Sequence, residues 1–337
     1  MIADARASVT WREAATSGEA VAAALEASAA APGRIVESLL SADLVVFSGA
    51  GSSYHLAQVV AWTYRAETGR PAIAVPLSEI LLRPAGVFGA GPERAVAVVI
   101  SRSGETSEAV AVAAQRRAAG AVTIAVTCRA ESPLASLATE RLVSPLGDER
   151  AIVMTRSFTS MLALLLGIVG RGAVGSALGA DLARLPDRFD ALTGPEVERA
   201  WARSAEMSWS RIVVLGGGAT FGLAHEACLK VTETSQLPAS AYEPLEFRHG
   251  PISVCEPGVL VLGLPGGPGA AEERRVLDEC ADLGASTWWL DPAPDLYHAA
   301  RLPLLLPPIQ ALALGLAAAR GRDPDAPRHL SQVVVLE

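Results

Sequence analysis

The sequence almost lacks one of the two common basic residues. Of its 28 lysine and arginine residues, a single one is a lysine, Lys230, and all the others are arginine. Arginine stays protonated near neutral pH and cannot act as an amine nucleophile, whereas lysine can lose its proton and attack a carbonyl. A coding bias toward arginine is the simpler explanation of this composition. Any chemistry that needs a side-chain amine is nevertheless restricted to Lys230.

Other absences exclude whole classes of protein. The net charge of −8 argues against nucleic acid as the main partner. The four cysteines show neither CxxC nor zinc-ligand spacing, so we expect no metal site and a reduced, cytoplasmic location. The first residues are too polar for a signal peptide. Residues 161–170 are followed by Arg171 and residues 302–319 contain two consecutive prolines, so we expect no membrane span.

The chain contains an internal repeat. Residues 45–57, VVFSGAGSSYHLA, match residues 212–224, IVVLGGGATFGLA. Each stretch runs from apolar, β-branched residues through glycines and a small hydroxyl residue into an amphipathic segment. This order predicts a strand, a tight loop and a helix. Residues 95–127 and 258–290 form a second matching pair, and each reads as strand, helix and strand.

Continuous apolar strands that alternate with helices predict an α/β fold, with parallel sheets covered by helices on both faces. We expect two such units in tandem, each a parallel sheet sandwiched between helices in a three-layer αβα arrangement, at residues 35–185 and 195–320. A helical linker is expected between them. An N-terminal helical segment, residues 1–34, precedes the two units, and a tail, residues 321–337, follows them.

The stretch VVISRSGETSEAV, residues 98–110, is the strongest candidate for a ligand site. Ligands of open parallel sheets bind at the carboxyl ends of strands. Here a strand runs directly into Ser101, Ser103 and Thr106 at the start of a helix, which predicts a phosphate cradle. The alternative is a helix cap formed by Ser103, with Thr106 three residues later.

A neighbouring loop adds two more hydroxyl groups. Ser52 and Ser53 follow the first strand of the repeat, and a cap formed by Ser103 does not explain them. The second repeat has LPGGPG where the first has its serines, so we expect one phosphate site per chain, in the first unit. The glycine loop at Gly51 lacks the full GxGxxG spacing, so we do not expect a dinucleotide.

Several motifs in the same order resemble the sugar isomerase (SIS) domain family. They are SGAGSS at 48–53, SRSGETSEAV at 101–110, ERAIVMTRSFTSMLALLL at 149–166, LEFRHGPIS at 245–253 and the tail DAPRHLSQVVVLE at 325–337. The tandem arrangement resembles the isomerase half of glucosamine-6-phosphate synthase. It is also similar to stand-alone glucosamine-6-phosphate deaminases and to ketose/aldose isomerases of the tagatose-6-phosphate type.

The resemblance implies a set of phosphate-binding residues and a set of further pocket residues. The phosphate-binding residues are Ser53, Ser101, Arg102, Ser103 and Thr106. The further candidates are Gly51, Ser52, Thr155 and Gln332. Where this sequence has Arg102 the synthase has glutamine, so arginine here either adds a charged contact to phosphate or narrows the pocket. Glu149 lies just upstream of Thr155, and its role stays open.

A helix expected to begin near Thr220 carries the candidate catalytic residues. Glu226, Lys230 and Glu233 stand on one face, and the pattern alone favours an exposed ion pair worth about 0.3–0.5 kcal/mol. The resemblance implies instead that Glu233 moves a proton between C1 and C2 of an open-chain sugar, with Lys230 on the same helix. A carboxylate can act as base at one carbon and acid at the next.

His249 is the ring-opening histidine by the same resemblance. An imidazole exchanges protons near neutral pH, which suits transfer between the ring oxygen and the C1 hydroxyl. The alternative is a turn cap before Gly250 and Pro251. The family also implies a homodimer with His249 near the interface. The other four histidines are expected to be structural or on the surface.

Gln332 departs from the family pattern. It stands where the synthase tail has a lysine that forms a Schiff base with the sugar, and an amide cannot form an imine. With no glutaminase segment ahead of the first unit, this argues against a synthase-like cycle. We expect a sugar-phosphate isomerase or deaminase without a cofactor, with glucosamine 6-phosphate to fructose 6-phosphate plus ammonia as the lead case. The alternative is a phosphosugar-binding sensor without catalysis.

Overall fold

The computed structural model describes residues 5–89, 91–189, 194–206 and 209–334, which form two compact units. The N-sheet unit comprises Ser17–Glu149, Arg156–Arg188 and Ser331–Glu337. The C-sheet unit comprises Met1–Thr16, Arg150–Thr155 and Phe189–Leu330. The units therefore exchange short segments along the chain, because residues 5–16 and 331–334 each belong to the unit that is more distant in sequence.

The N-sheet unit is built on a parallel sheet of five strands in the order β2-β1-β3-β4-β5. The strands are β1 (Leu44–Gly49), β2 (Ala72–Pro76), β3 (Ala95–Ile100), β4 (Thr123–Thr127) and β5 (Glu140–Val143). In register, Val45 of β1 lies opposite Ala72 of β2 and Val96 of β3. Every residue of β3 and β4 is buried, as expected for strands covered on both faces.

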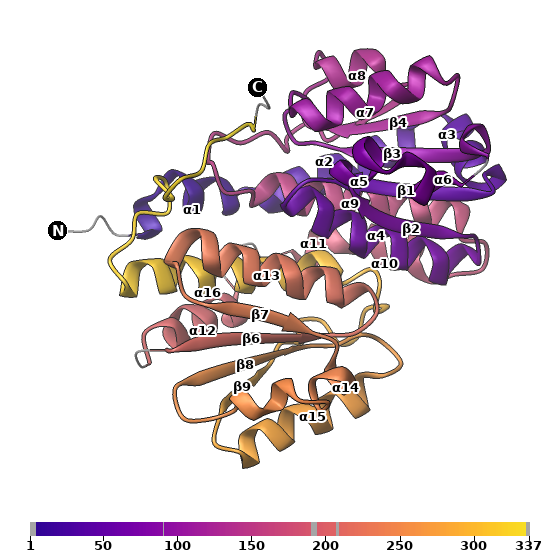
Figure 1. Cartoon of the computed structure of the whole chain (residues 1–337). Coiled ribbons are helices and arrows are strands. Elements are labelled where there is room, and N and C mark those ends of the chain that lie inside the picture. Colours follow the sequence, from indigo (N-terminus) through magenta and orange to yellow (C-terminus); the bar gives the residue numbers. More distant parts are fainter. Residues whose placement is uncertain (1–4, 90, 190–193, 207–208, 335–337) are drawn as a thin grey trace. The chain divides into compact units, whose positions relative to one another are not determined.

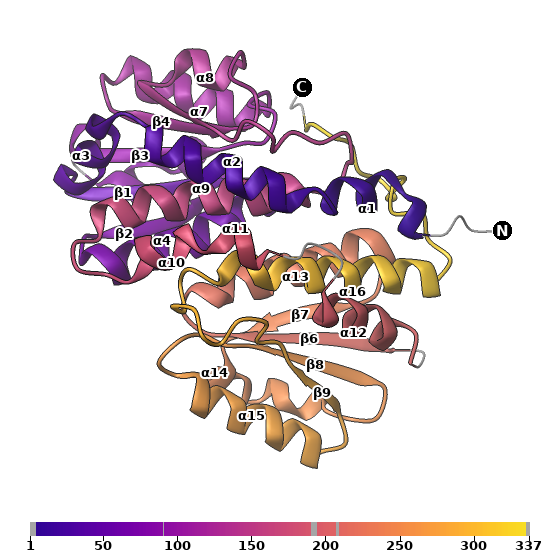
Figure 2. The same ribbon diagram turned by 180° about the vertical axis from the view of Figure 1, so that it is seen from behind.

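Helices cover both faces of this sheet (Figure 1). The helices of the unit are α2 (Ser17–Ala30), α3 (Gly33–Ser41), α4 (Ser52–Thr68), α5 (Leu77–Leu82), α6 (Pro84–Phe88), α7 (Ser107–Ala118), α8 (Pro133–Leu137), α9 (Arg156–Gly172), α10 (Leu178–Ala183) and α11 (Leu185–Arg188), with one 3-10 turn, η2 (Pro92–Arg94). Helices α2, α4 and α9 pack together on one face, where α2 and α9 lie side by side (Figure 2).

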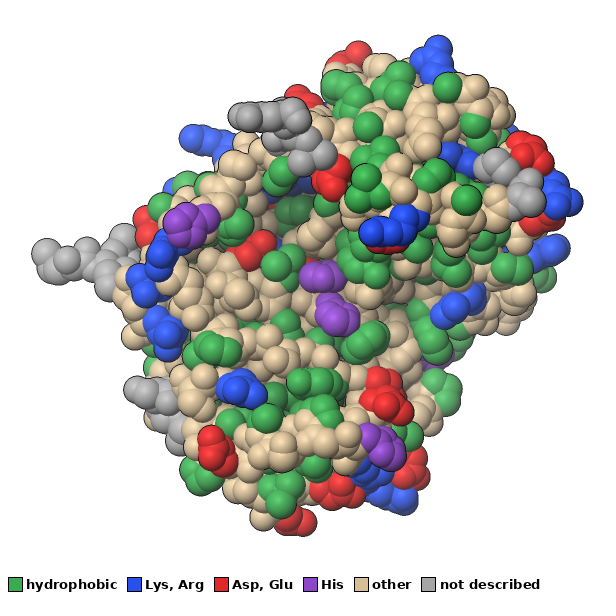
Figure 3. All heavy atoms as spheres, in the orientation of Figure 1, with side chains coloured by type: hydrophobic (Ala, Val, Ile, Leu, Met, Phe, Trp, Pro, Cys, Tyr) green, Lys and Arg blue, Asp and Glu red, His purple; other side chains and the backbone are tan. Residues whose placement is uncertain are grey.

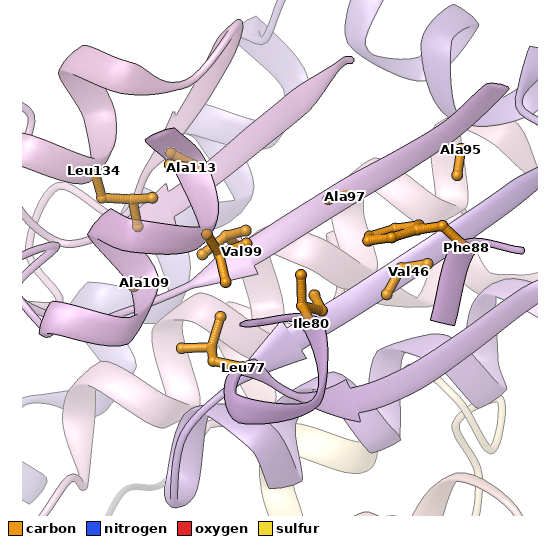
Figure 4. Close-up of a cluster of buried hydrophobic side chains, with 12 residues drawn as sticks. Val46, Leu77, Ile80, Phe88, Ala95, Ala97, Val99, Ala109, Ala113 and Leu134 are labelled. Atoms are coloured by element: carbon orange, nitrogen blue, oxygen red, sulfur yellow. The ribbon is translucent and has the colours of Figure 1, made fainter. Parts of the chain in front are cut away.

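The other face carries a hydrophobic core under α5, α7 and α8 (Figure 4). Val46 and Val99 project from the sheet toward Leu77 and Ile80 of α5. Leu134 of α8 closes the cluster at its far end. Full burial of each such side chain contributes about 1.5–3 kcal/mol, so this core fixes the strand ends and the loops that follow them.

The C-sheet unit repeats this plan with four parallel strands in the order β7-β6-β8-β9. The strands are β6 (Arg211–Gly216), β7 (Ala239–Tyr242), β8 (Val259–Leu264) and β9 (Ser286–Trp289). The helices are α1 (Val9–Ala14), α12 (Pro195–Ser204), α13 (Ala219–Ser235), α14 (Pro244–Phe247), α15 (Ala270–Asp282) and α16 (Leu306–Ala319), with the 3-10 turns η1 (Ala5–Ala7), η3 (Pro251–Val254) and η4 (Leu302–Leu305). Helices α12, α13 and α16 pack together, and α14 and α15 form a separate layer (Figure 1).

Each sheet has a strand-to-helix junction of the same geometry, which confirms the internal repeat. Gly51 precedes α4 with φ 55° and ψ −126°, and Gly218 precedes α13 with φ 59° and ψ −127°. A Cβ atom on Gly49 would lie 2.4 Å from the backbone of Ser53, and one on Gly216 would lie 2.5 Å from the backbone of Thr220. The paired glycines are therefore needed for a left-handed turn and for close packing of helix on strand.

The longest apolar segment belongs to the core. Leu302–Ala319 has the length and composition of a membrane span, yet 89% of it is buried inside the protein. A segment buried in this way is a core helix, which agrees with its packing against α12 and α13.

Candidate functional site

The loop after β3 gathers three hydroxyl groups at the start of α7. The hydroxyls of Ser101 and Thr106 lie 3.1 Å apart, and the N–H of Gly104 donates to Ser101 Oγ at 3.1 Å. Ser103 Oγ accepts from the N–H of Glu105 at 3.1 Å. Ser101 and Ser103 are buried, each with 4% of its surface exposed. The loop is thus a compact turn that presents small donors at a helix N-terminus.

The helix-cap alternative for Ser103 is wrong. The residue before α7 is Thr106, and its side chain makes no cap hydrogen bond. The Ser103 hydroxyl bonds inside the loop instead. Gly104 has φ +65°, and a Cβ atom there would lie 2.2 Å from Ser132 Oγ, so the loop can close only with glycine.

The neighbouring loop lies at the same edge of the sheet. Strands β1 and β3 are adjacent and parallel, so the residues that follow them emerge at one edge. Ser52 and Ser53 are the first residues of α4, and both are buried. Exposed Gly51 precedes them. The structure therefore places the hydroxyl residues predicted in the two loops at the carboxyl ends of two adjacent strands.

Arg102 and Gln332, the two positions at which the sequence departs from the resembled pattern, contact each other. Arg102 Nη2 donates to the backbone oxygen of Gln332 at 3.0 Å. Gln332 Nε2 donates to the backbone oxygen of Glu149 at 2.9 Å. Arg102 Nη1 lies 3.7 Å from Glu149 Oε1, and both side chains are buried. Sequence reasoning left the role of Glu149 open, and its burial beside a guanidinium is what singles it out.

Thr155, a further pocket candidate, belongs to the C-sheet unit. It is buried, and its backbone oxygen accepts from Gln310 Nε2 of α16 at 3.3 Å. By its contacts, the segment Arg150–Thr155 belongs to the C-sheet unit. Thr155 therefore packs against α16, whereas the serines of the β3 loop belong to the N-sheet unit.

Helix α13 carries a buried cation between two carboxylates. Lys230 Nζ lies 2.7 Å from Glu233 Oε2 and 3.4 Å from Glu226 Oε1. The exposed fractions of the side chains are 1% for Glu226, 3% for Lys230 and 18% for Glu233. The alternative of an exposed ion pair is therefore wrong for Glu226 and Lys230. Of the three, Glu233 is the one whose side chain is partly exposed.

The surroundings of this cluster are apolar. Ala224, Ala227, Cys228 and Val231 are buried along the same helix. Burial raises the pKa of the Cys228 thiol to about 12, so it stays protonated at neutral pH. A charge in such a region is costly unless it is paired, which is why the lysine has two carboxylates beside it.

His249 stands at the opposite edge of the C-sheet unit from Glu233. Helix α13 starts at the carboxyl end of β6, and Glu233 lies 14 residues along it, about 20 Å away at 1.5 Å per residue. Strand β7 then runs back to the first edge, and His249 follows α14 beyond its end. His249 is exposed, and its N–H donates to the backbone oxygen of Glu246 at 3.0 Å. The turn-cap alternative is therefore supported by one backbone hydrogen bond of His249 and not by a bond of its imidazole.

The described part of the chain offers no metal site. It contains no group of three or more histidine, cysteine, aspartate or glutamate side chains that could hold a metal ion. On the face drawn in Figure 3, basic side chains are scattered among acidic and apolar ones. Among the coloured residues of that face there is no broad basic patch of the kind that binds a nucleic-acid backbone.

Comparison with known proteins gives a family match. The SIS domain model matches residues 38–169 and 207–290, one segment in each repeat. The chain is 30% identical over 330 residues to the glutamine–fructose-6-phosphate aminotransferase (isomerizing) of Aeropyrum pernix, covering 88% of this chain and 52% of that protein. The corresponding protein of Tropheryma whipplei strain Twist is 30% identical over 334 residues, covering 90% and 53%. The chain thus spans about half the length of these curated relatives.

Solved structures match over nearly the whole chain. A glucosamine-6-phosphate deaminase from Thermotoga maritima has a TM-score of 0.79 at 29% identity, covering 98% of this chain and all of that one. A tagatose-6-phosphate ketose/aldose isomerase from Escherichia coli has a TM-score of 0.83 at 23% identity, covering 100% of this chain and 98% of that one. The second match shows a common fold.

Proposed function

The chain belongs to the SIS domain family, and we propose that it interconverts the aldose and ketose forms of a sugar phosphate by proton transfer between C1 and C2. The lead case is an amino-sugar phosphate, glucosamine 6-phosphate, which gives fructose 6-phosphate and ammonia. The phosphate-binding groups are the hydroxyls of the β3 and β1 loops, Ser53, Ser101, Ser103 and Thr106. No cofactor takes part, and a cytoplasmic location fits the free thiols.

One observation carries the proposal, the pairing of Lys230 with Glu233. A proton shuttle needs a carboxylate that is held in one orientation and still reaches the substrate. Glu233 Oε2 receives a 2.7 Å hydrogen bond from a buried ammonium, while part of the side chain stays exposed. Glu226, on the buried side, supplies the second negative charge that the lysine needs. This arrangement suits a group that gives up and regains one proton per turnover.

The proposed step balances without a redox partner. Glu233 takes the proton from C2 of the open-chain aldehyde, and electrons move through the C1–C2 bond as O1 is protonated. The same carboxyl group then returns its proton to C1 while the proton on O2, or on the nitrogen at C2, passes to solvent and balances the proton taken up at O1. The product is a ketose, or a ketimine where C2 bears an amino group. Water adds to the ketimine and ammonia leaves, so one water is consumed and the ketose phosphate is released.

We propose a role for His249 in a second subunit of a homodimer. Ring opening requires a proton donor and acceptor near C1, the same carbon to which Glu233 returns its proton. The α/β topology supports a role in trans, because Glu233 and His249 lie at opposite edges of one C-sheet unit. An exposed imidazole of one subunit can complete the site of another.

The test is an assay of the purified protein with glucosamine 6-phosphate and, separately, with fructose 6-phosphate and ammonium. Ammonia and fructose 6-phosphate are measured in the first reaction, and glucosamine 6-phosphate in the second. Turnover in either direction supports the deaminase. Interconversion of other aldose and ketose phosphates without release of ammonia supports the isomerase. Binding of these sugar phosphates with no turnover of any supports the sensor and contradicts the catalytic proposal.

A further inference from the structure

The side chain and the backbone of Arg102 are both committed to contacts inside the N-sheet unit. The guanidinium is buried, donates to the backbone oxygen of Gln332 and faces the Glu149 carboxylate. The backbone oxygen of Arg102 accepts from Cys128 N–H at 2.9 Å and from Thr127 Oγ1 at 3.0 Å. The backbone of Arg102 is thus hydrogen-bonded at the end of β4, and its side chain is hydrogen-bonded to Gln332.

Glu149 holds Arg102 and the start of α9 together. Its side chain is completely buried, and Oε1 accepts from the hydroxyl of Ser157 and from Ser157 N–H at 3.3 Å. Oε2 accepts from Arg156 N–H at 3.0 Å. These N–H groups belong to the first turn of a helix, where backbone donors have no intrahelical partner. A buried carboxylate with this many donors and a cation beside it is held in one place.

Residues 332–334 contact Arg102, Glu149 and the first residue of α7. The backbone oxygen of Gln332 accepts from the Arg102 guanidinium, and the side-chain amide of Gln332 donates to the backbone oxygen of Glu149. Two residues on, the backbone oxygen of Val334 accepts from Ser107 N–H at 3.4 Å. Ser107 is the first residue of α7, so its N–H is one of the donors that a helix N-terminus offers to an anion. A carbonyl of the C-terminal segment occupies it.

From these contacts we propose that Arg102 is a positioning residue that, with Glu149, fixes residues 332–334 on the phosphate loop, and that it is not a ligand of the phosphate. Two strong donors at this loop, the guanidinium and the Ser107 N–H, bind carbonyls of the C-terminal segment. The phosphate then depends on the hydroxyls of Ser101, Ser103 and Thr106, together with Ser53 of the β1 loop. The inference rests on the proposed function only in treating this loop as an anion site.

Amide hydrogen exchange at Ser107, resolved with overlapping peptides, measures the attachment without any ligand. Arg102→Gln removes the guanidinium, and Gln332→Ala removes the contact to Glu149 from an exposed residue whose loss leaves the fold intact. We expect each variant to exchange Ser107 about tenfold faster than the wild type, as loss of one such attachment predicts. Arg129→Gln is the matched control, because it removes a nearby cation that pairs with Glu105 and Asp148. It leaves the exchange unchanged.

A thermal-shift titration with inorganic phosphate separates the two roles of Arg102. We expect the apparent Kd of the Arg102→Gln variant to stay within about threefold of the wild type, since neutral and backbone donors carry the anion. Unchanged exchange at Ser107 in Arg102→Gln contradicts the positioning role. Loss of phosphate binding in that variant contradicts the statement that Arg102 is not a ligand. If the wild type itself binds no phosphate, the proposed function of the loop fails, and the exchange result still decides the positioning role.

Discussion

The ammonium of Lys230 lies 2.7 Å from Oε2 of Glu233 and 3.4 Å from Oε1 of Glu226. It is the one lysine of the sequence. The Glu226 side chain is buried with it and the Glu233 side chain is partly exposed, so the lysine links a buried carboxylate to one at the edge of the buried region. This geometry predicts an electrostatic lysine rather than a nucleophile, because a nucleophilic amine must give up its proton and approach a carbonyl.

Substitutions of Lys230 separate these two roles. Lys230→Arg keeps the charge, and we expect a weakened but active enzyme. Lys230→Met leaves two carboxylates without their cation, and we expect a loss of about 3–5 kcal/mol in the free energy of unfolding together with loss of turnover. Borohydride reduction in the presence of substrate, followed by mass spectrometry, should give no sugar adduct. An adduct on Lys230, or an Arg variant as inactive as the Met variant, contradicts the electrostatic role.

The β3 loop is tested by removing two of its hydroxyls. Ser103→Ala combined with Thr106→Ala deletes two donors to a charged group, each worth about 1.5–3 kcal/mol, so we expect KM for the sugar phosphate to rise at least about 100-fold. The free energy of unfolding should change far less. Ser41→Ala, which removes an exposed hydroxyl at the end of α3, is the control and should keep the wild-type KM. Unchanged KM in the double variant would remove the loop from the phosphate site.

The trans role of His249 is tested by mixing two inactive variants. In a homodimer that shares its sites, a heterodimer of Glu233→Gln and His249→Ala subunits contains one site with both native residues. Random exchange of subunits should therefore restore about a quarter of the wild-type activity. Each variant alone stays inactive. If Glu233 and His249 of the same chain act together, every site carries a substitution and mixing restores nothing.

Glu273 predicts a measurable dependence of stability on pH. Burial and the nearby charge of Glu243 raise its pKa, against the opposing effect of a hydrogen bond from Gly266 N–H at 2.7 Å. A carboxyl group whose pKa is raised by folding stabilises the protein below its ordinary pKa, and this contribution is lost as pH rises through the folded value. The free energy of unfolding of wild type should therefore fall relative to that of Glu273→Gln as pH rises above about 4.5, the ordinary pKa of the group.

Chemical denaturation at several pH values gives this difference. Glu272→Gln, on the same helix but exposed and paired with Arg275, is the control and should show no comparable trend. A difference between wild type and Glu273→Gln that stays constant with pH, or that moves the other way, contradicts the cause assigned to the raised pKa.

The fold was predictable because its signals are local and repeated. Glycines at 49 and 51 and at 216 and 218 mark two identical strand-to-helix turns, and the apolar strands beside them predict parallel sheets. The exchange of chain ends between the units was not predictable in this way. The contacts of Thr10 with Asp325, for example, join residues far apart in sequence, and no periodic pattern encodes such a pairing.

The candidate site was predictable in its residue types but not in its environments. Spacing placed Glu226, Lys230 and Glu233 on one face of a helix, yet that spacing is the same for an exposed and a buried ion pair. Only packing against α16 and the sheet makes the pair buried. Likewise, neither Arg102 nor Gln332 carries any sign in the sequence that both meet at Glu149, because that contact joins segments 230 residues apart.

The central claim is that Glu233 carries the proton between C1 and C2. Glu233→Gln keeps the shape of the side chain and an acceptor for Lys230 but removes the base, and Glu256→Gln, at an exposed position of the same unit, is its control. The most direct measurement is kcat for glucosamine 6-phosphate in these two variants and in the wild type. We predict a loss of at least about 100-fold in kcat for Glu233→Gln, with KM little changed, and wild-type kinetics for Glu256→Gln. Full activity of the Glu233→Gln variant would contradict the mechanism proposed for this protein.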